Sequence, residues 1–371
     1  MSEQAVRLLN SLLGIYSPSG KEEHISSFLV EQMETLGFTV RKDAVGNVIG
    51  EIGEGEPIVL LCGHMDTIAG KLPVRVEHDK LYGAGAVDAK SSLAAMIMAA
   101  ATLARESALN AKVLVVGAVE EEATSRGIKH IIEQKLKADY AIFGEPSGLG
   151  NITIGYKGSL HLRITCKTET GHSSTPWFYE NALEKGFELW QQIKNVYPPV
   201  EEQESPYHAV TLALVKLTGG RGNSKIPSEC EMRVDIRVPP KFTVAQVFSV
   251  VKRAIKRYQA ANPKVSVEVA ILDQNEPFEV AKNSVLVRAL SYAIRKVQKR
   301  PAKLLRKTGT GDMNILGKAT STPIVTYGPG DSHLDHTKEE HIDINDYLMS
   351  IQVYRETIVK LSELHRKCVN Q

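Results

Sequence analysis

Histidine and carboxylate side chains follow short apolar segments of this 371-residue chain, at positions where a buried strand would end. The first such segment, 58–62, precedes His64 and Asp66, which share a face in extended backbone because side chains two apart point the same way. A glycine-punctuated loop then delivers Asp88 directly before the apolar helical stretch 93–103. His and Asp arriving together suggest a metal site, although a lone His-x-Asp pair is more often a satisfied polar pair.

The same arrangement recurs after later apolar segments. The residues that follow these segments are Glu120, Glu121 and Glu122 after 113–119, Glu145 after 140–143, and His333 and His336 after 323–327. Adjacent carboxylates raise one another's pKa unless cations compensate for their charge, and a solvated acidic turn is the alternative for the run 120–122. Strands that alternate with helices imply a mostly parallel sheet, in which ligands bind beyond the carboxyl ends of the strands. The sequence therefore predicts that these side chains converge in one metal site.

The predicted ligand set has few histidines and several carboxylates, which makes it too rich in oxygen for a structural zinc site. It suits a pair of hydrolytic metal ions that share a bridging carboxylate, and Asp88 is the natural bridge. We therefore expect two divalent ions. Zinc, cobalt and manganese all accept such ligands.

Helical and strand patterns predict the scaffold that positions these residues. Residues 21–36 have helical spacing, and Ser19 with Glu22 three positions later predicts a capping box at the start of that helix. Residues 40–52 predict a hairpin that turns at Gly46. With the apolar segments described above, these elements predict an α/β domain built on an open, mostly parallel sheet with helices on both faces.

The pattern changes between 158 and 272, where strand-like and helical segments predict an α+β insert of β-α-β-β-α-β order. We therefore expect 1–157 and 273–371 to be the two parts of a metal-binding catalytic domain, and 158–272 to be an inserted lid. A hydrophobic content of 43% is sufficient for both cores.

Composition excludes several classes of function. The net charge is +2 with both signs interspersed, so we expect no nucleic-acid partner. No apolar run approaches membrane-spanning length, and the N-terminal residues lack the features of a signal peptide, so we expect a cytoplasmic protein without a membrane partner. The four cysteines are scattered, which disfavours a thiolate zinc site and a disulfide framework.

Together, these motifs resemble those of the dinuclear-zinc exopeptidases and deacylases, a family that includes acetylornithine deacetylase, succinyl-diaminopimelate desuccinylase and the carboxypeptidase G-type enzymes. The resemblance covers essentially the whole chain, and the motifs occur in the family's order. It implies a zinc-exopeptidase fold with a ferredoxin-like lid and dimerisation domain. It also implies two divalent metal ions, zinc or alternatively cobalt, and the hydrolysis of a linear amide.

The resemblance implies a role for each candidate residue in the catalytic domain. The metal ligands that it implies are His64, Asp88, Glu122, Glu145 and His336. It makes Asp66 the group that orients His64, and Glu121 the general base. His333 is the alternative to His336, but it precedes the family's His-Thr-x-x-Glu pattern.

In the lid, the resemblance makes His172 a donor to the developing oxyanion in the neighbouring subunit's active site, which implies a homodimer formed through the lid. Arg237 resembles the family's clamp on a substrate carboxylate, and Asn223 and Thr310 match further substrate-binding positions. Without the resemblance, His172 would be interpreted as a polar loop histidine and Arg237 as a surface arginine. Asn223 stands one place earlier than in the family's Asn-Val-Ile-Pro pattern, and Ala84 replaces the arginine of its Gly-Arg-Gly.

Within the family, the tracts 120–130, 171–177 and 307–314 are most similar to hydrolases that release lysine or ornithine from a small acidic amino-group carrier protein in lysine and arginine biosynthesis. That similarity implies cleavage of an amide between a glutamate γ-carboxyl and the α-amine of the amino acid. The alternatives are deacetylation of N-acetylornithine or N-acetyl-lysine, a small dipeptidase, a two-metal phosphoesterase and a dimeric binding module without activity. The chain has no phosphate-cradling loop, which disfavours the phosphoesterase.

Overall fold

The computed structural model describes residues 2–202, 204–220, 222 and 224–369, and it divides the chain into two compact units. Unit 1 comprises Met1–Gly155, Val280–Leu305 and Gly311–Gln371, and unit 2 comprises Tyr156–Glu279 and Arg306–Thr310. Among the described residues, no helix is both long and apolar enough to span a bilayer.

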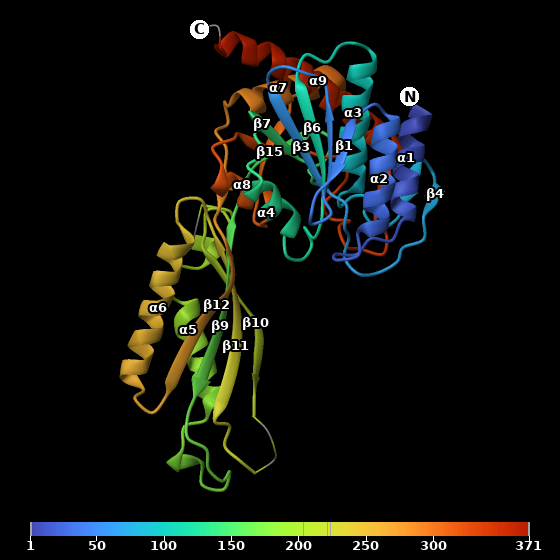
Figure 1. The fold of residues 1–371 in the computed structure, drawn as a ribbon. Coiled ribbons are helices and arrows are strands. Elements are labelled where there is room, and N and C mark those ends of the chain that lie inside the picture. Colours follow the sequence, from blue (N-terminus) through green and yellow to red (C-terminus); the bar gives the residue numbers. More distant parts are fainter. Residues whose placement is uncertain (1, 203, 221, 223, 370–371) are drawn as a thin grey trace. The chain divides into compact units, whose positions relative to one another are not determined.

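Unit 1 is built on a mixed, mostly parallel sheet of order β1-β2-β6-β3-β7-β15-β8, with β14 also paired to β8 (Figure 1). The strands are β1 (Thr39–Lys42), β2 (Val48–Ile52), β3 (Ile58–His64), β6 (Lys112–Ala118), β7 (Tyr140–Phe143), β8 (Asn151–Tyr156), β14 (Lys303–Lys307) and β15 (Ile324–Thr326). β3 pairs in parallel with β6 and β7, and β7 pairs in parallel with β15. The carboxyl ends of these four strands therefore meet at one edge of the sheet, as the sequence predicts. β1 and β2 form the predicted antiparallel hairpin.

Helices flank this sheet, which confirms the predicted α/β class (Figure 1). They are α1 (Ser2–Gly14), α2 (Glu23–Thr35), α3 (Lys90–Arg105), α4 (Arg126–Glu133), α7 (Val285–Gln298), α8 (Asp312–Ala319) and α9 (Ile344–Val369). α3 is buried along 90–103 and packs against α1, α9 and β3, because a helix that is apolar on all sides has no face for water. A small sheet of order β16-β5-β4 completes unit 1, with β4 (Arg75–Glu77), β5 (Lys80–Tyr82) and β16 (His341–Asp343).

The predicted capping box at the start of α2 is wrong. The residue before the helix is Glu22, and its side chain makes no cap hydrogen bond. The Ser19 hydroxyl instead donates to Asp66 Oδ2 at 2.7 Å, and Glu22 Oε1 accepts hydrogen bonds from the backbone N–H groups of Gly20 and Glu120. The Ser19 hydroxyl and the Glu22 carboxylate therefore bond to Asp66 and Glu120, and not to the capping partners that the sequence pattern predicts.

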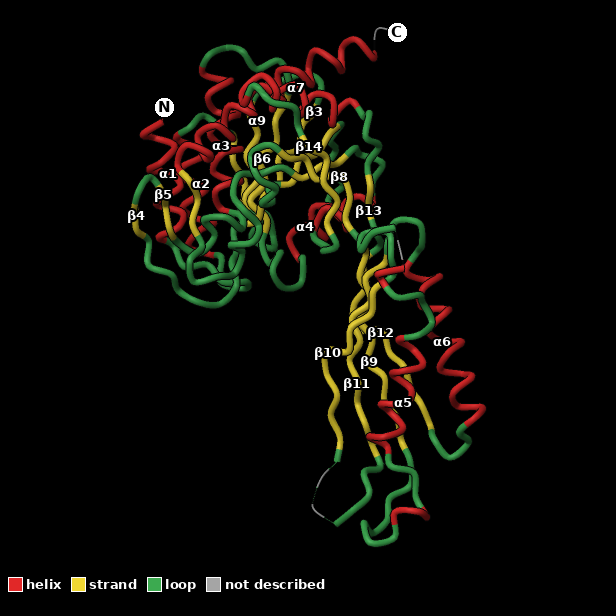
Figure 2. The backbone as a smooth tube through the Cα atoms, turned by 180° about the vertical axis from the view of Figure 1, so that it is seen from behind, coloured by secondary structure: helices red, strands yellow, loops and turns green. Residues whose placement is uncertain are grey.

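Unit 2 has the predicted β-α-β-β-α-β order and a core of its own (Figure 2). Its elements are β9 (Gly158–Lys167), α5 (Ala182–Lys194), β10 (Thr211–Gly219), β11 (Glu229–Val238), α6 (Val244–Ala261) and β12 (Ser266–Asn275), with short 3₁₀ helices at Pro176–Phe178 and Val200–Glu202 and the two-residue strand β13 (Phe278–Glu279). The sheet is antiparallel in the order β10-β11-β9-β12, and α5 and α6 pack against it. Alternate residues of β11 from Cys230 to Val238 are buried in that core, as period-2 strands require.

Candidate metal centre

Three of the predicted ligands come together at the carboxyl edge of the unit 1 sheet. His64 is the last residue of β3, Asp88 lies just before α3, and Glu122 follows β6. One ligand atom from each of these side chains lies within 4.8 Å of the ligand atoms of the other two, and the group could hold a metal ion. His64 is buried and the two carboxylates are half-buried, so little water competes for these donors.

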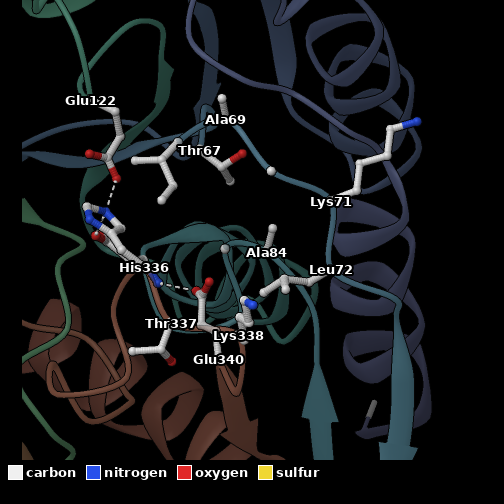
Figure 3. A pocket seen from close by; sticks show the side chains of 14 residues that line it. Thr67, Ala69, Lys71, Leu72, Ala84, Glu122, His336, Thr337, Lys338 and Glu340 are labelled. Carbon is white, nitrogen blue, oxygen red and sulfur yellow. Dashed lines mark hydrogen bonds and ion pairs between the residues drawn. The ribbon is translucent and has the colours of Figure 1, made fainter.

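His336 joins this group from the C-terminal part of unit 1. Its Nε2 atom lies 2.7 Å from Glu122 Oε1 and 3.3 Å from Asp88 Oδ2, and Figure 3 shows its ring facing Glu122. The other carboxylate oxygen of Asp88, Oδ1, lies 3.2 Å from His64 Nε2. The two oxygens of Asp88 therefore face two different histidines, which is the arrangement that a carboxylate shared by two ions needs.

The electrostatics of this group also suit a cation. Hydrogen bonds to Asp88 and Glu122 raise the pKa of His336 to about 9. Burial opposes the protonation of His64, but hydrogen bonds to Asp66 and Asp88 outweigh burial and hold its pKa well above the ordinary value. The carboxylates thus attract positive charge onto the imidazoles. Two imidazoles and several carboxylates are a suitable donor set for hydrolytic divalent ions, so the residues present fit such a metal.

Glu145 and His333, two further candidates, are not members of the close group of His64, Asp88 and Glu122. Glu145 follows β7, as predicted, but it is outside the close group of His64, Asp88 and Glu122. Its charge acts on Glu121, and after burial it is the largest cause of the raised pKa of the Glu121 carboxyl. His333 is exposed, and its ring contacts Asp331 of the same loop at 2.8 Å.

Glu121, the predicted general base, lies beside the start of α8. Its Oε1 atom would be 3.1 Å from a Cβ placed on Gly311, so the absence of a side chain there leaves room for the carboxyl. Burial, followed by the charges of Glu145 and Asp312, holds the pKa of Glu121 well above its ordinary value. Burial also raises the pKa of Asp312 to about 6. This environment favours a carboxyl group that takes up and holds a proton.

Asp66 contacts both the ring of His64 and the backbone of Glu121 and Glu122. Its Oδ1 atom accepts a hydrogen bond from the backbone N–H of Glu121 at 3.1 Å, and its Oδ2 accepts one from Glu122 at 3.2 Å and one from the Ser19 hydroxyl. Its main-chain carbonyl lies 2.9 Å from His64 Nδ1. Asp66 is fully buried, so these contacts fix both the ring of His64 and the backbone that carries the two glutamates.

Sequence reasoning did not connect three residues with the centre, although their side chains brace the loops around it. They are Ser19, Glu22 and Glu340. Glu340 is buried, and its Oε1 atom accepts hydrogen bonds from the backbone N–H groups of Val87 and Asp88 at 2.9 and 3.1 Å. The only sequence signal for Glu340 was its place at the end of the tract 336–340. No local pattern indicates that a glutamate accepts hydrogen bonds from the backbone of a loop far away in the sequence.

The predicted substrate-binding residues belong to unit 2. Arg237 Nη1 donates to Thr310 Oγ1 at 3.3 Å, and its Nη2 donates to Asp235 Oδ2 at 2.9 Å, so the structure brings Arg237 and Thr310 together. His172 is exposed on a loop, where its Nδ1 atom lies 2.8 Å from Ser174 Oγ. Asn223, the third predicted substrate contact, lies outside the described residues.

A cavity of about 260 Å³ in unit 1 opens beside the centre. Asp88, Glu122 and His336 form one side of it, and the segments 67–72 and 336–340 form much of the remaining wall (Figure 3). A group bound in this cavity would therefore lie next to the predicted metal ligands.

Comparison with known proteins shows where the chain belongs. A relative in Pyrococcus furiosus is 38% identical over 362 residues, which cover 97% of this chain and 98% of the relative. A relative in Saccharolobus islandicus, named [LysW]-lysine/[LysW]-ornithine hydrolase, is 32% identical over 363 residues and covers 97% of each chain.

Solved structures share the fold. A Staphylococcus aureus tripeptidase superposes with a TM-score of 0.85 at 21% identity, over 98% of this chain and 99% of that one. A dinuclear metal-binding peptidase of the M20 family from Bacillus subtilis superposes with a TM-score of 0.72 at 15% identity, over 98% of each chain. The model of peptidase family M20/M25/M40 matches residues 60–360. The chain is therefore a hydrolase that acts on amide bonds, and it belongs to peptidase family M20/M25/M40.

Proposed function

We propose that this chain is a two-metal amide hydrolase that releases lysine or ornithine from an amino-group carrier protein. The observation that carries the proposal is the near full-length match to a relative named [LysW]-lysine/[LysW]-ornithine hydrolase. The scissile bond is then the amide between the γ-carboxyl of a glutamate at the end of the carrier and the α-amine of the amino acid. Such a reaction belongs to lysine and arginine biosynthesis, which we assign to the cytoplasm.

The metal ligands in this proposal are His64, Asp88, Glu122, Glu145 and His336, with Asp88 shared between two ions. The contacts of both Asp88 oxygens with different histidines support the shared position. Zinc is the expected metal and cobalt the alternative. When bound, the ions supply Lewis acidity that polarises the amide carbonyl and lowers the pKa of a water molecule.

Glu121 moves the proton in this reaction. Its carboxylate accepts a proton from the attacking water and then donates it to the nitrogen of the leaving amine. The buried and acidic surroundings of Glu121 support this role, because they make the carboxyl a better proton acceptor than an exposed glutamate.

Two lid residues act on the substrate. Arg237, held by Asp235 and Thr310, pairs with the carboxylate of the amino acid that is released. His172 donates a hydrogen bond to the developing oxyanion of a neighbouring subunit, so the working form is a homodimer assembled through the lid. The exposure of His172 leaves it available for that contact.

The test compares substrates on zinc-loaded and cobalt-loaded protein. We expect release of lysine or ornithine from the loaded carrier with a kcat/KM at least about 100-fold above that for N-acetyl-lysine and N-acetylornithine, because carrier contacts add binding energy. A higher kcat/KM for the N-acetyl forms would assign the chain as a deacetylase instead. Bound metal without turnover of any of these amides would favour a binding module.

A further inference from the structure

The cavity beside the metal centre has a mixed wall. Apolar groups from Ile68, Leu72 and Ala84 line it together with the side chains of Lys71 and Lys338. In Figure 3, Lys338 lies beside Glu340 on the cavity wall, and Lys71 extends away from His336. Apolar walls with a small number of placed polar groups are typical of small-molecule sites.

The charges of this wall favour an anion. Among the residues that the structure describes, neither Lys71 nor Lys338 has a carboxylate partner within 4.0 Å. Lys71 lies over the ring of Tyr16, with its Nζ atom 5.2 Å from the ring centre. The Glu340 carboxylate is already engaged by the backbone N–H groups of Val87 and Asp88. Apart from the metal ligands, the wall therefore offers free positive charge and no free negative charge.

This distribution of charge decides which half of the substrate fits. The amino acid that leaves carries a cationic side chain, and two lysines repel a cation. The acyl half is a glutamyl group joined through its γ-carbonyl, so its α-carboxylate stays free. A cavity of about 260 Å³ has room for a small acyl group such as a glutamyl group.

We propose that this cavity binds the acyl half of the substrate, and that Lys338, assisted by Lys71 at the rim, selects acyl groups that carry a free carboxylate. The proposal rests on the function proposed above. The amide carbonyl then lies against Asp88, Glu122 and His336, and the methylene groups of the glutamyl chain lie along Ile68, Leu72 and Ala84. Lys338 is a specificity-determining residue here, since it contacts no atom of the bond that is cleaved.

The test uses three synthetic amides of the lysine α-amine that differ only in the acyl group. γ-Glutamyl-lysine carries both the carboxylate and the amine, glutaryl-lysine keeps the carboxylate, and 4-aminobutanoyl-lysine keeps the amine. We expect kcat/KM for the two carboxylate-bearing amides to exceed that for 4-aminobutanoyl-lysine by about 10- to 100-fold, the value of one charge-assisted hydrogen bond.

Variants assign that preference to the cavity. Lys338→Gln should reduce the preference to about twofold or less, mainly by raising KM for the carboxylate-bearing amides. Lys338→Arg should retain most of the preference, because arginine keeps the positive charge. Lys71→Gln should have a smaller effect than Lys338→Gln. The control is Lys137→Gln, which makes the same charge change at an exposed position of unit 1 outside the cavity. A preference that survives in Lys338→Gln, or that is absent from the unchanged protein, would overturn the proposal.

A binding measurement separates this proposal from the proposed function. Calorimetry on zinc-loaded protein compares glutarate, which has two carboxylates, with butanoate, which has one. Lys338→Gln should weaken glutarate binding about tenfold or more and leave butanoate unchanged. The unchanged protein could release no lysine or ornithine from the loaded carrier while Lys338→Gln still weakens the binding of glutarate and not that of butanoate. That result would contradict the proposed carrier function and would support the carboxylate subsite. Equal binding of the two acids would contradict the subsite directly.

Discussion

At the level of single residues, the acidic run after β6 separates into side chains with different partners. Glu120 turns away from the centre, because its Oε1 atom pairs with Arg126 Nε at 2.9 Å. Glu122 faces His336, and Glu121 lies in the buried acidic pocket near Asp312. Adjacent glutamates of identical type therefore offer matched variants for testing the assignment of the general base.

Glu121→Gln should keep the metal and lose turnover. The amide is nearly the same size as the carboxyl but cannot accept the proton, so kcat should fall by about 10²- to 10⁴-fold. Elemental analysis of the purified variant should give the same metal content as the unchanged protein. Glu120→Gln is the control and should keep near-normal kcat. If Glu121→Gln retained normal kcat, a different residue would have to be the base.

Asp66→Asn should weaken metal binding although Asp66 is not itself a ligand. The amide NH₂ group would face the backbone N–H of Glu121 or Glu122, where the carboxylate now accepts, and the glutamate-bearing turn would shift. Loss of such a supporting contact costs about 10- to 100-fold in metal affinity. Competition against a zinc chelator measures the change. Ser19→Ala removes one hydrogen bond to the same carboxylate and should have a smaller effect. Unchanged affinity in Asp66→Asn would show that the turn holds its position without Asp66.

At the level of elements, the centre depends on how closely three segments approach one another. A Cβ on Gly328, which follows β15, would lie 2.7 Å from the carbonyl oxygen of Glu145 and would also overlap the Ser92 hydroxyl at the start of α3. A side chain at this position would push apart the loops after β7 and β15. The glycine therefore fixes the spacing of the strand ends that carry the site.

Gly328→Ala should accordingly destabilise unit 1. Overpacking against backbone atoms costs about 1–3 kcal/mol, which a shift in the midpoint of urea unfolding would measure. Gly14→Ala is the matched control, because no atom lies within 4 Å of a Cβ there, and it should change stability by no more than about 0.5 kcal/mol. A neutral result at Gly328 would show that these loops can move apart freely.

A buried lysine in unit 2 should make stability depend on pH. Burial and the charge of Arg237 lower the pKa of Lys157 to about 8, from an ordinary value of 10.5. Between these values the unfolded chain binds more protons than the folded one, so the free energy of unfolding rises with pH across that interval. Lys157→Met removes this contribution. The melting temperature of the unchanged protein, relative to that of the variant, should therefore rise between pH 8 and about pH 10.5. A difference that is independent of pH would mean that the folded lysine titrates normally.

The sequence predicted the strand ends because their signals are local. An apolar run that stops at a histidine or an acid indicates both the strand and its exit, so the positions of His64, Glu122 and Glu145 followed from pattern alone. Ser19 was misassigned because its local pattern fits a helix cap, whereas the buried Asp66 carboxylate is a stronger partner that only the folded chain brings near. Glu340 was missed for the same reason. The structure brings several of these residues together, but the role of each candidate site residue stays a prediction.

At the level of the whole molecule, the two units have separate cores and carry different parts of the proposed chemistry. The close group of candidate metal ligands lies in unit 1, and Arg237 and His172 lie in unit 2. A ligand that binds only the folded form stabilises the unit to which it binds. Metal removal is therefore expected to act on one unit and spare the other.

The positions of the tryptophans allow the two units to be followed separately. Trp177 and Trp190, the two tryptophans of the chain, are both in unit 2, so their fluorescence reports the unfolding of that unit, whereas calorimetry reports both. A chelator should lower the calorimetric transition of unit 1 by about 5–10 °C, since metal at 100 times its Kd contributes about 2.7 kcal/mol, and should leave the fluorescence midpoint in place. His64→Ala, which lacks a central ligand, should show no response to the chelator. If the fluorescence and calorimetric midpoints fell together, the units would unfold as one cooperative body and the metal would stabilise both.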